Sequence, residues 1–136
     1  MALRTLFAVI TASALLFGCS KADLRELRDE TEEALHDAGD ALSELAGQAE
    51  GPIHDSAEQA LDVADEARDA SREFAENPTT ESRQALEAAG RHVDDVQREL
   101  EGLVDRAPGG VKDLVQRALD ALSDVRRKID RQLDEG

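Results

Sequence analysis

The sequence contains few of the residues that usually build binding pockets and disulfide frameworks. It has no tryptophan or tyrosine, three phenylalanines and one cysteine among 136 residues. A single cysteine excludes an intramolecular disulfide. The scarcity of aromatic side chains argues against a large pocket for a small molecule, because such pockets are usually lined by apolar and aromatic groups.

Basic residues are also scarce, which restricts the possible partners. Sixteen lysines and arginines stand against 31 aspartates and glutamates, giving a formal net charge of −15 at pH 7. Nucleic acid is not expected as a partner, because such binding depends on basic side chains that neutralise phosphates. Anionic lipid head groups are disfavoured for the same reason. We expect most of the acidity to form a solvated outer face.

No apolar stretch near the start of the chain is long enough to span a membrane as a helix. The apolar run 5–17 has about 13 residues, whereas a membrane helix needs about 20. Arg4 precedes the run, and the small residue Gly18 follows it. A positive charge, a short apolar stretch and a small residue before a cut are the parts of an export signal. The sequence therefore predicts a signal peptide over 1–18 and a mature domain over 19–136.

The end of this signal resembles a known processing motif. The string Leu16-Phe17-Gly18-Cys19 resembles the lipobox of bacterial lipoproteins, although the resemblance covers only about the first 20 residues. In that family a diacylglyceryl group is attached to the cysteine thiol, and signal peptidase II then cuts before the cysteine. The resemblance implies cleavage after Gly18, lipidation of Cys19 and a membrane anchor through that lipid. Ser20 after the cysteine, rather than aspartate, implies the outer membrane of a Gram-negative bacterium, with the domain facing the periplasm.

The mature domain is predicted to be all-α. It is rich in alanine, leucine, glutamate, aspartate and arginine, most of which lose little side-chain freedom in a helix. Proline and glycine break the chain at 51–52, 77–78 and 108–110, because proline cannot continue a helix through its interior. Four helical segments result, near 22–48, 53–76, 80–106 and 111–133.

Polar residues and prolines near these breaks predict where the helices begin. Ser20, with an aspartate three residues on, resembles a capping box, so the first helix is expected to begin almost at the lipid. Pro52 and Pro78 suit first-turn positions, and Thr79 or Thr80 can cap the third helix.

Apolar residues recur with alternating spacings of three and four along the segments, which indicates amphipathic helices. The stripe of the third segment is Leu86, Ala89, Val93, Val96, Leu100 and Leu103, and that of the fourth is Val111, Val115, Ala118, Leu122, Val125 and Ile129. Connections this short favour an antiparallel up-down four-helix bundle. The alternative is two long helical hairpins that complete a core by oligomerisation, which the thin, alanine-rich stripes leave open.

No set of residues in the sequence predicts catalysis. Glu33 and His36 match once the Glu-x-x-His spacing of di-iron bundles, but the second copy that such sites need is missing. The break at 109–110 is a better helix terminator than a phosphate loop, and lipidation would occupy the thiol of Cys19. We therefore expect no catalytic residue, no metal site and no cofactor.

The sequence also indicates where His92 lies and which charged side chains pair within helices. A weak internal repeat places His92 where Ala41, Ala67 and Val125 stand in the other segments, at the core or its edge. A rim histidine is favoured there over a pH-sensing one. Acid-first pairs four residues apart are expected within helices. These pairs are Glu87 with Arg91, Asp94 with Arg98, Asp113 with Arg117, and Asp124 with Lys128.

Together these features predict a non-enzymatic envelope lipoprotein. Its helical domain would act as a scaffold or protein-interaction module, with another envelope protein or a second copy of the chain as partner. The alternative is a periplasm-facing binding or inhibitory module for a soluble ligand, peptide or enzyme. The sequence contains nothing that decides between these two classes.

Overall fold

The computed structural model describes residues 2–135, with the side chains of residues 23–135. Within this part of the chain every regular element is helical, so the fold is all-α, as the composition predicts. The elements are α1 (Ala2–Gln48), α2 (Gly51–Glu76), α3 (Thr80–Leu103), the 3-10 helix η1 (Val104–Arg106) and α4 (Gly109–Glu135).

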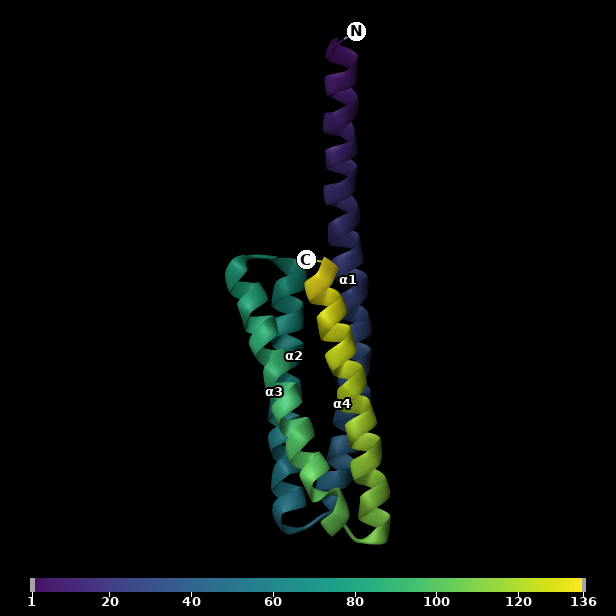
Figure 1. Cartoon of the computed structure of the whole chain (residues 1–136), viewed down its shortest axis with the longest axis vertical. Helices are drawn as coiled ribbons and strands as arrows, with labels where there is room; N and C mark the ends of the chain where they lie inside the picture. Colours follow the sequence, from purple (N-terminus) through teal and green to yellow (C-terminus); the bar gives the residue numbers. More distant parts are fainter. Residues whose placement is uncertain (1, 136) are drawn as a thin grey trace.

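The four α-helices run alternately up and down and form one antiparallel bundle (Figure 1). Each helix contacts the next along the chain, and α4 returns against α1 to close the ring. The predicted up-down bundle is therefore confirmed, and its core closes within a single chain.

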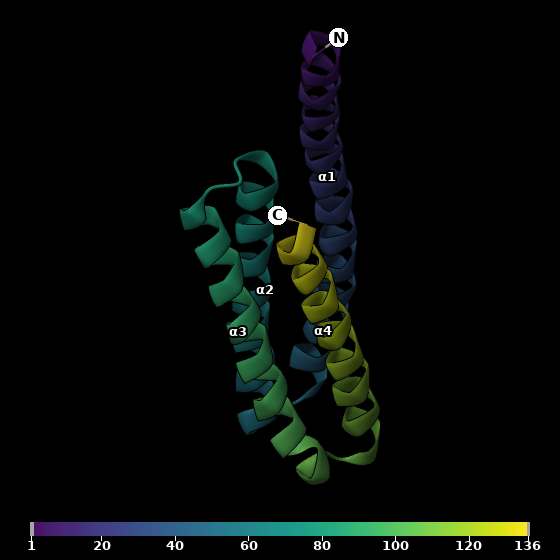
Figure 2. The same cartoon turned by 45° about the horizontal axis from the view of Figure 1, so that its top comes forward.

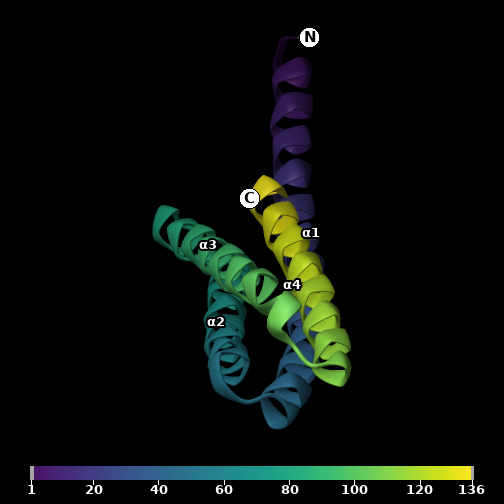
Figure 3. The ribbon, with the colours of Figure 1, turned by 60° about the horizontal axis from the view of Figure 1, so that its bottom comes forward.

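The bundle has two distinct ends (Figures 1 and 2). The end with the α2–α3 turn and the last residues of α4 is called the base, and the N-terminal part of α1 extends beyond it. The opposite end, called the tip, carries the α1–α2 and α3–α4 connections, and Figure 3 brings it forward. The base therefore lies on the side of the predicted anchor.

Local backbone chemistry sets the starts of α2 and α3. Gly51 has φ 65°, a left-handed conformation that glycine adopts without steric cost, and Pro52 stands in the first turn of α2 as predicted. Thr79 caps α3, because its hydroxyl accepts the Ser82 N–H at 3.0 Å while the Ser82 hydroxyl accepts the Thr79 N–H at 2.8 Å. Pro78 precedes this cap, so its expected first-turn position is wrong.

The helix α1 begins much earlier than the sequence pattern indicates. It continues without a break from Ala2 through Ser20 to Gln48, so the predicted helix start at Ser20 is wrong for the uncut chain. The run 5–17 is rich in alanine and leucine, which favour helix, and no proline follows it before residue 22. Only removal of residues 1–18 would bring the start of the helix near Ser20.

The predicted stripes form the core. All positions from Leu86 to Leu100 in the α3 stripe and from Val115 to Ile129 in the α4 stripe are at most 1% exposed. Leu103 and Val111, which end these stripes at the tip, are only partly buried. The helix α2 contributes mostly alanines, which bury little surface each but let neighbouring backbones approach closely.

A buried hydrogen-bond network crosses the core between α1, α2 and α4. The Oε1 atom of Gln132 accepts from the hydroxyls of Thr31 at 3.0 Å and Ser71 at 2.7 Å, and its Nε2 donates to the Ser71 carbonyl at 3.0 Å. All three residues are 0% exposed. Gln132 follows Ile129 along the α4 stripe, so a polar group occupies a core position there. Buried polar groups need such partners, because an unpaired one would lose its hydrogen bonds to water.

Candidate functional site

The predicted processing residues lie at the base of the bundle. The side chain of Cys19 lies outside the described part of the chain, while the backbone of Gly18 and Cys19 belongs to α1. Leu24, five residues after Cys19, is only 3% exposed. The packed bundle therefore begins close to the predicted lipid, with little chain between them.

His92 lies on the surface between α2 and α3. Its side chain is 49% exposed, and Nδ1 lies 3.0 Å from both carboxylate oxygens of Glu66 on α2. Of the expected positions, the core or its edge, the structure places His92 at the edge, as the favoured rim interpretation predicts. The neighbouring Val93, which belongs to the predicted stripe, is 0% exposed.

His54 holds the start of α2 against the end of α1. Its Nδ1 lies 2.7 Å from the carbonyl oxygen of Ala46, and its Nε2 lies 3.1 Å from Oε1 of Glu58. The hydrogen bond to Ala46 is the main cause that raises the pKa of His54; the charges of Glu58 and Asp55 act in the same direction, and desolvation opposes them. The protonated ring donates to both acceptors, so it fits this position better than the neutral ring.

The single Glu-x-x-His match does not face the core. Glu33 and His36 are both exposed on α1, and Nε2 of His36 lies 3.5 Å from Asp40. Among the residues that the structure describes, no group of three or more histidine, cysteine, aspartate or glutamate side chains is arranged to hold a metal ion.

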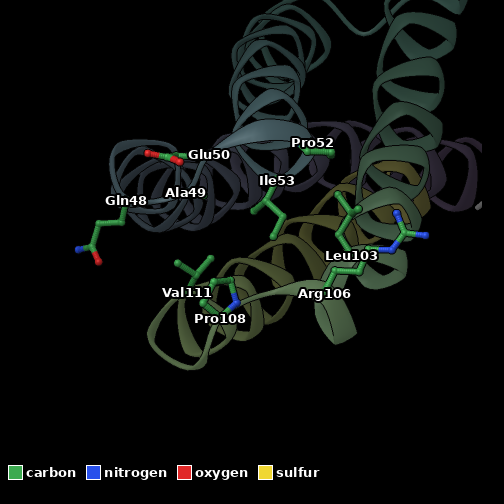
Figure 4. A pocket seen from close by; sticks show the side chains of 9 residues that line it. All are labelled: Gln48, Ala49, Glu50, Pro52, Ile53, Leu103, Arg106, Pro108 and Val111. Atoms are coloured by element: carbon green, nitrogen blue, oxygen red, sulfur yellow. The ribbon is translucent and has the colours of Figure 1, made fainter.

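An apolar pocket of about 270 Å³ opens at the tip. It lies between the α1–α2 connection and the segment that joins α3 to α4, as Figure 4 shows. Gln48, Glu50 and Arg106 also line it, and the Arg106 side chain extends alongside Leu103 (Figure 4). The apolar part of the lining is Ala49, Pro52, Ile53, Leu103, Pro108 and Val111.

A second, more polar cavity continues from the tip pocket onto the face between α2 and α3. It has a volume of about 430 Å³ and shares Pro52, Leu103 and Arg106 with the tip pocket. Arg98 lines it as well. Among the described side chains, neither Arg98 nor Arg106 forms an ion pair. Asp55 and Glu99 line this cavity too, so the continuous depression carries carboxylates as well as the two arginines.

The tip pocket was not predicted from the sequence, although the sequence contains a signal for it. Ile53 and Val111 each follow a Pro/Gly break by one residue, and an up-down bundle brings those two breaks to the same end. At that end the helices stop, so no neighbouring helix extends far enough to bury every apolar residue of the first turns. An opening between the connections follows from that arrangement.

The observed ion pairs differ from the predicted ones. None of the four expected pairs within a helix forms in the described side chains. Three of the eight residues pair across helices instead: Asp94 with Arg126 at 3.1 Å, Arg117 with Glu44 at 3.4 Å and Lys128 with Glu30 at 3.9 Å. Two pair with other arginines of their own helix: Glu87 with Arg83 and Asp124 with Arg127, both at 3.2 Å.

Comparison with known proteins gives no relative for this chain. No protein-family model, curated protein or solved structure matches it. Within the described residues, none of the helices is both long and apolar enough to cross a bilayer. The fold defines the class as an all-α four-helix bundle, and the function has to be argued from the residues.

Proposed function

We propose that this protein is a non-enzymatic envelope lipoprotein, anchored to the outer membrane through Cys19, whose helical bundle acts by contact with another envelope protein. The observation that carries the proposal is the lipobox-like string ending at Cys19, placed after Arg4 and a short apolar run. Several acyl chains on one cysteine would hold the protein stably, since each buried methylene contributes about 0.8 kcal/mol.

The position of the bundle supports a role as a scaffold or interaction module. Leu24 is already packed, so a lipid on Cys19 would hold the base close to the bilayer. The packed part of α1, 24–48, is about 37 Å long at 1.5 Å per residue. The tip would then stand about that far from the base, toward the periplasm. The acidic surface would contribute orientation and solubility more than affinity.

The tip pocket favours a second candidate function. An apolar opening with Arg106 at its side also suits a periplasm-facing binding or inhibitory module for a soluble ligand, peptide or enzyme. Both candidates act by binding. They differ in whether the partner is itself held in the envelope.

Mass spectrometry of the protein isolated from membranes tests the anchor. We expect an acylated N-terminal cysteine in the wild type and an uncut, unlipidated chain for Cys19→Ser, because only the thiol can carry the thioether. Ser20→Ala, which keeps the thiol, is the matched control and should still be lipidated. An unmodified Cys19 thiol in the wild type would refute the lipoprotein proposal.

Site-specific crosslinking in cells tests the contact function. A photoreactive residue at exposed Asp105, near the tip, should capture a defined membrane-associated protein, and one at exposed Arg91, on the side of α3, provides the comparison. Capture of a soluble periplasmic protein from Asp105 would favour the second candidate. Absence of any reproducible crosslink from either position would contradict both.

A further inference from the structure

We propose that His54 is a pH-dependent clasp, which holds the end of α1 to the first turn of α2 and thereby fixes one wall of the tip pocket. The clasp is closed when the imidazole ring is protonated and weaker when the ring is neutral. The inference goes beyond the proposed function and does not depend on the lipid anchor, because it concerns how the α1–α2 connection responds to pH.

The side chain of His54 joins two helix ends. Only residues 49 and 50 lie between α1 and α2, and Nδ1 of His54 reaches back from the first turn of α2 to within 2.7 Å of the Ala46 carbonyl oxygen. The carbonyl groups of the last helical turn have no amide partner inside their own helix. The Leu45 carbonyl accepts the Ala49 N–H at 2.8 Å, so Ala46 has the next carbonyl that a side chain can bind. A positive charge that binds such a carbonyl is favourable, because the C-terminal end of a helix carries a partial negative charge.

The protonation state of the ring decides whether both of its nitrogen atoms can donate. Nε2 of His54 lies 3.1 Å from Oε1 of Glu58, one turn further along α2, so each nitrogen faces an acceptor. The protonated ring has two N–H donors and the neutral ring has only one. Either neutral tautomer therefore directs a lone pair at an oxygen. The exposed Glu58 can turn toward water, but the bond to Ala46 then lacks the charge, and charge-assisted hydrogen bonds are about twice as strong as neutral ones.

The groups around His54 favour the protonated ring. The hydrogen bond to α1 is the main cause that raises its pKa; desolvation opposes it, and the charges of Glu58 and Asp55 raise the pKa further. The positive N-terminal end of α2 acts against protonation. Glu50 of the connection and Arg106 of η1 line the adjoining tip pocket, but among the described side chains only Glu58 forms an ion pair with His54. The net result is a pKa above the ordinary value.

The clasp stands beside the tip pocket. Ile53, the residue before His54, lines this pocket together with Ala49, Glu50 and Pro52 from the same connection. Because the pKa of His54 is raised, the clasp should be closed below about pH 6.5 and should weaken as the pH rises through the folded-state pKa. The wall that the α1–α2 connection contributes to the pocket is therefore fixed at low pH and more mobile at high pH.

Hydrogen–deuterium exchange of the full chain, held in lipid nanodiscs and read by mass spectrometry, tests this inference. Wild type is compared with His54→Asn at the same pH, so that intrinsic exchange rates cancel outside the substituted residue. Asparagine resembles histidine in helix propensity but cannot be protonated. At about pH 5.5 we expect amides within 45–56 to exchange about twofold to fivefold faster in the variant, the effect of one charge at an exposed helix C-terminus. At about pH 8.5 the two proteins should exchange alike.

Two further variants and an internal reference locate the effect. Glu58→Gln removes one of the charges that raise the pKa of His54, so the protection of 45–56 should be lost at a lower pH than in wild type. His36→Gln is the matched control, because His36 also lies near an acidic residue four positions on, Asp40 at 3.5 Å, but within α1 alone. It should leave 45–56 unchanged. Amides of the α2–α3 turn, at the opposite end of the bundle, should be unchanged in every variant.

Three results would overturn the inference. Equal exchange of wild type and His54→Asn at about pH 5.5 would mean that the ring holds nothing in place. A difference of the same size at both pH values would mean that His54 acts by packing and not through its proton. An equal change in the α2–α3 turn would mean that the whole bundle is destabilised and no local clasp exists. If His54→Asn does not fold, Glu58→Gln decides: a pH dependence identical to that of wild type contradicts the clasp, and a shift to lower pH supports it.

Discussion

Gly90 provides the sharpest test of the packing between α3 and α4. It is buried, and the side chain of Arg126 from α4 crosses the place where a side chain of residue 90 would begin. A Cβ atom at Gly90 would lie 2.2 Å from Nη1 and 3.0 Å from Cζ of Arg126. At Gly39, within α1, an added Cβ would meet nothing within 4 Å. Both glycines therefore have a helical backbone, but their surroundings differ.

The structure predicts opposite signs for the same substitution at these positions. Alanine in place of glycine inside a helix ordinarily stabilises a protein by about 0.5–1 kcal/mol, and Gly39→Ala should show this gain. Gly90→Ala should displace the guanidinium of Arg126, which loses the hydrogen bond from its Nε to Asp94 at 3.1 Å and the ion pair of its Nη1 with Asp130 at 2.8 Å. Hydrogen bonds to charged groups contribute about 1.5–3 kcal/mol, and partial exposure of Arg126 favours the low end. Gly90→Ala should therefore destabilise the protein by about 0.5–1.5 kcal/mol.

Urea unfolding, followed by far-UV circular dichroism on a chain that begins at Ser20, measures both changes. The slope of the free energy against urea should stay constant, so that the midpoint reports stability. In an Arg126→Ala background, Gly90→Ala should become stabilising, because the obstructing side chain is gone; this double-mutant cycle isolates the contact. If Gly90→Ala alone stabilises the protein as much as Gly39→Ala, the guanidinium moves aside at no cost and the reasoning is wrong.

Three further predictions concern the core and the α1–α2 connection. Leu122→Ala should cost about 2–5 kcal/mol in urea unfolding, because Leu122 is 1% exposed; a loss below 1 kcal/mol would place it outside the core. Gln132→Ala should cost about 2–4 kcal/mol, because it leaves a cavity and removes the acceptor of the Ser71 hydroxyl, whereas adding Ser71→Ala should cost little more if the two act as one network. The pKa of His54 is raised above its ordinary value of about 6.5. Its contribution to stability is thus fully present below about pH 6.5 and lost as the pH rises through the folded-state pKa, so His54→Ala should cost more at about pH 5.5 than at about pH 8.5; equal losses in thermal melts would contradict this.

The fold could be predicted from the sequence because its determinants are local. Proline and glycine mark the breaks, and the 3-4 spacing from Leu86 to Leu100 identifies the buried face of α3 without reference to any other helix. The start of α1 could not be placed in the same way. The alanine- and leucine-rich run 5–17 favours helix, so α1 extends beyond the expected start.

The side-chain pairings could not be predicted, because they depend on how each helix is rotated about its axis. The apolar stripe places Val93 in the core, whereas the internal repeat places its neighbour His92 at the core or its edge; Val93 is 0% exposed and the His92 side chain is 49% exposed. Asp94 had one candidate partner within its own helix and found Arg126 on α4 instead. The buried position of Gln132 was equally hidden, because a glutamine on an apolar stripe ordinarily indicates the end of the stripe.

The polar residues explain how an alanine-rich core can specify one alignment of its helices. Small apolar side chains such as those of α2 would pack almost as well after a shift of one helical turn, about 5.4 Å. Such a shift would remove the partners of Gln132, whose amide is buried among three helices, and leave a polar group unpaired in the core. The surface pairs between neighbouring helices add little stability each, but they oppose the same shift. Since the tip pocket is formed by two connections, the relative position of Ile53 and Val111, which both line it, depends on that alignment. The buried network should therefore determine the shape of the tip pocket as well as the stability of the bundle.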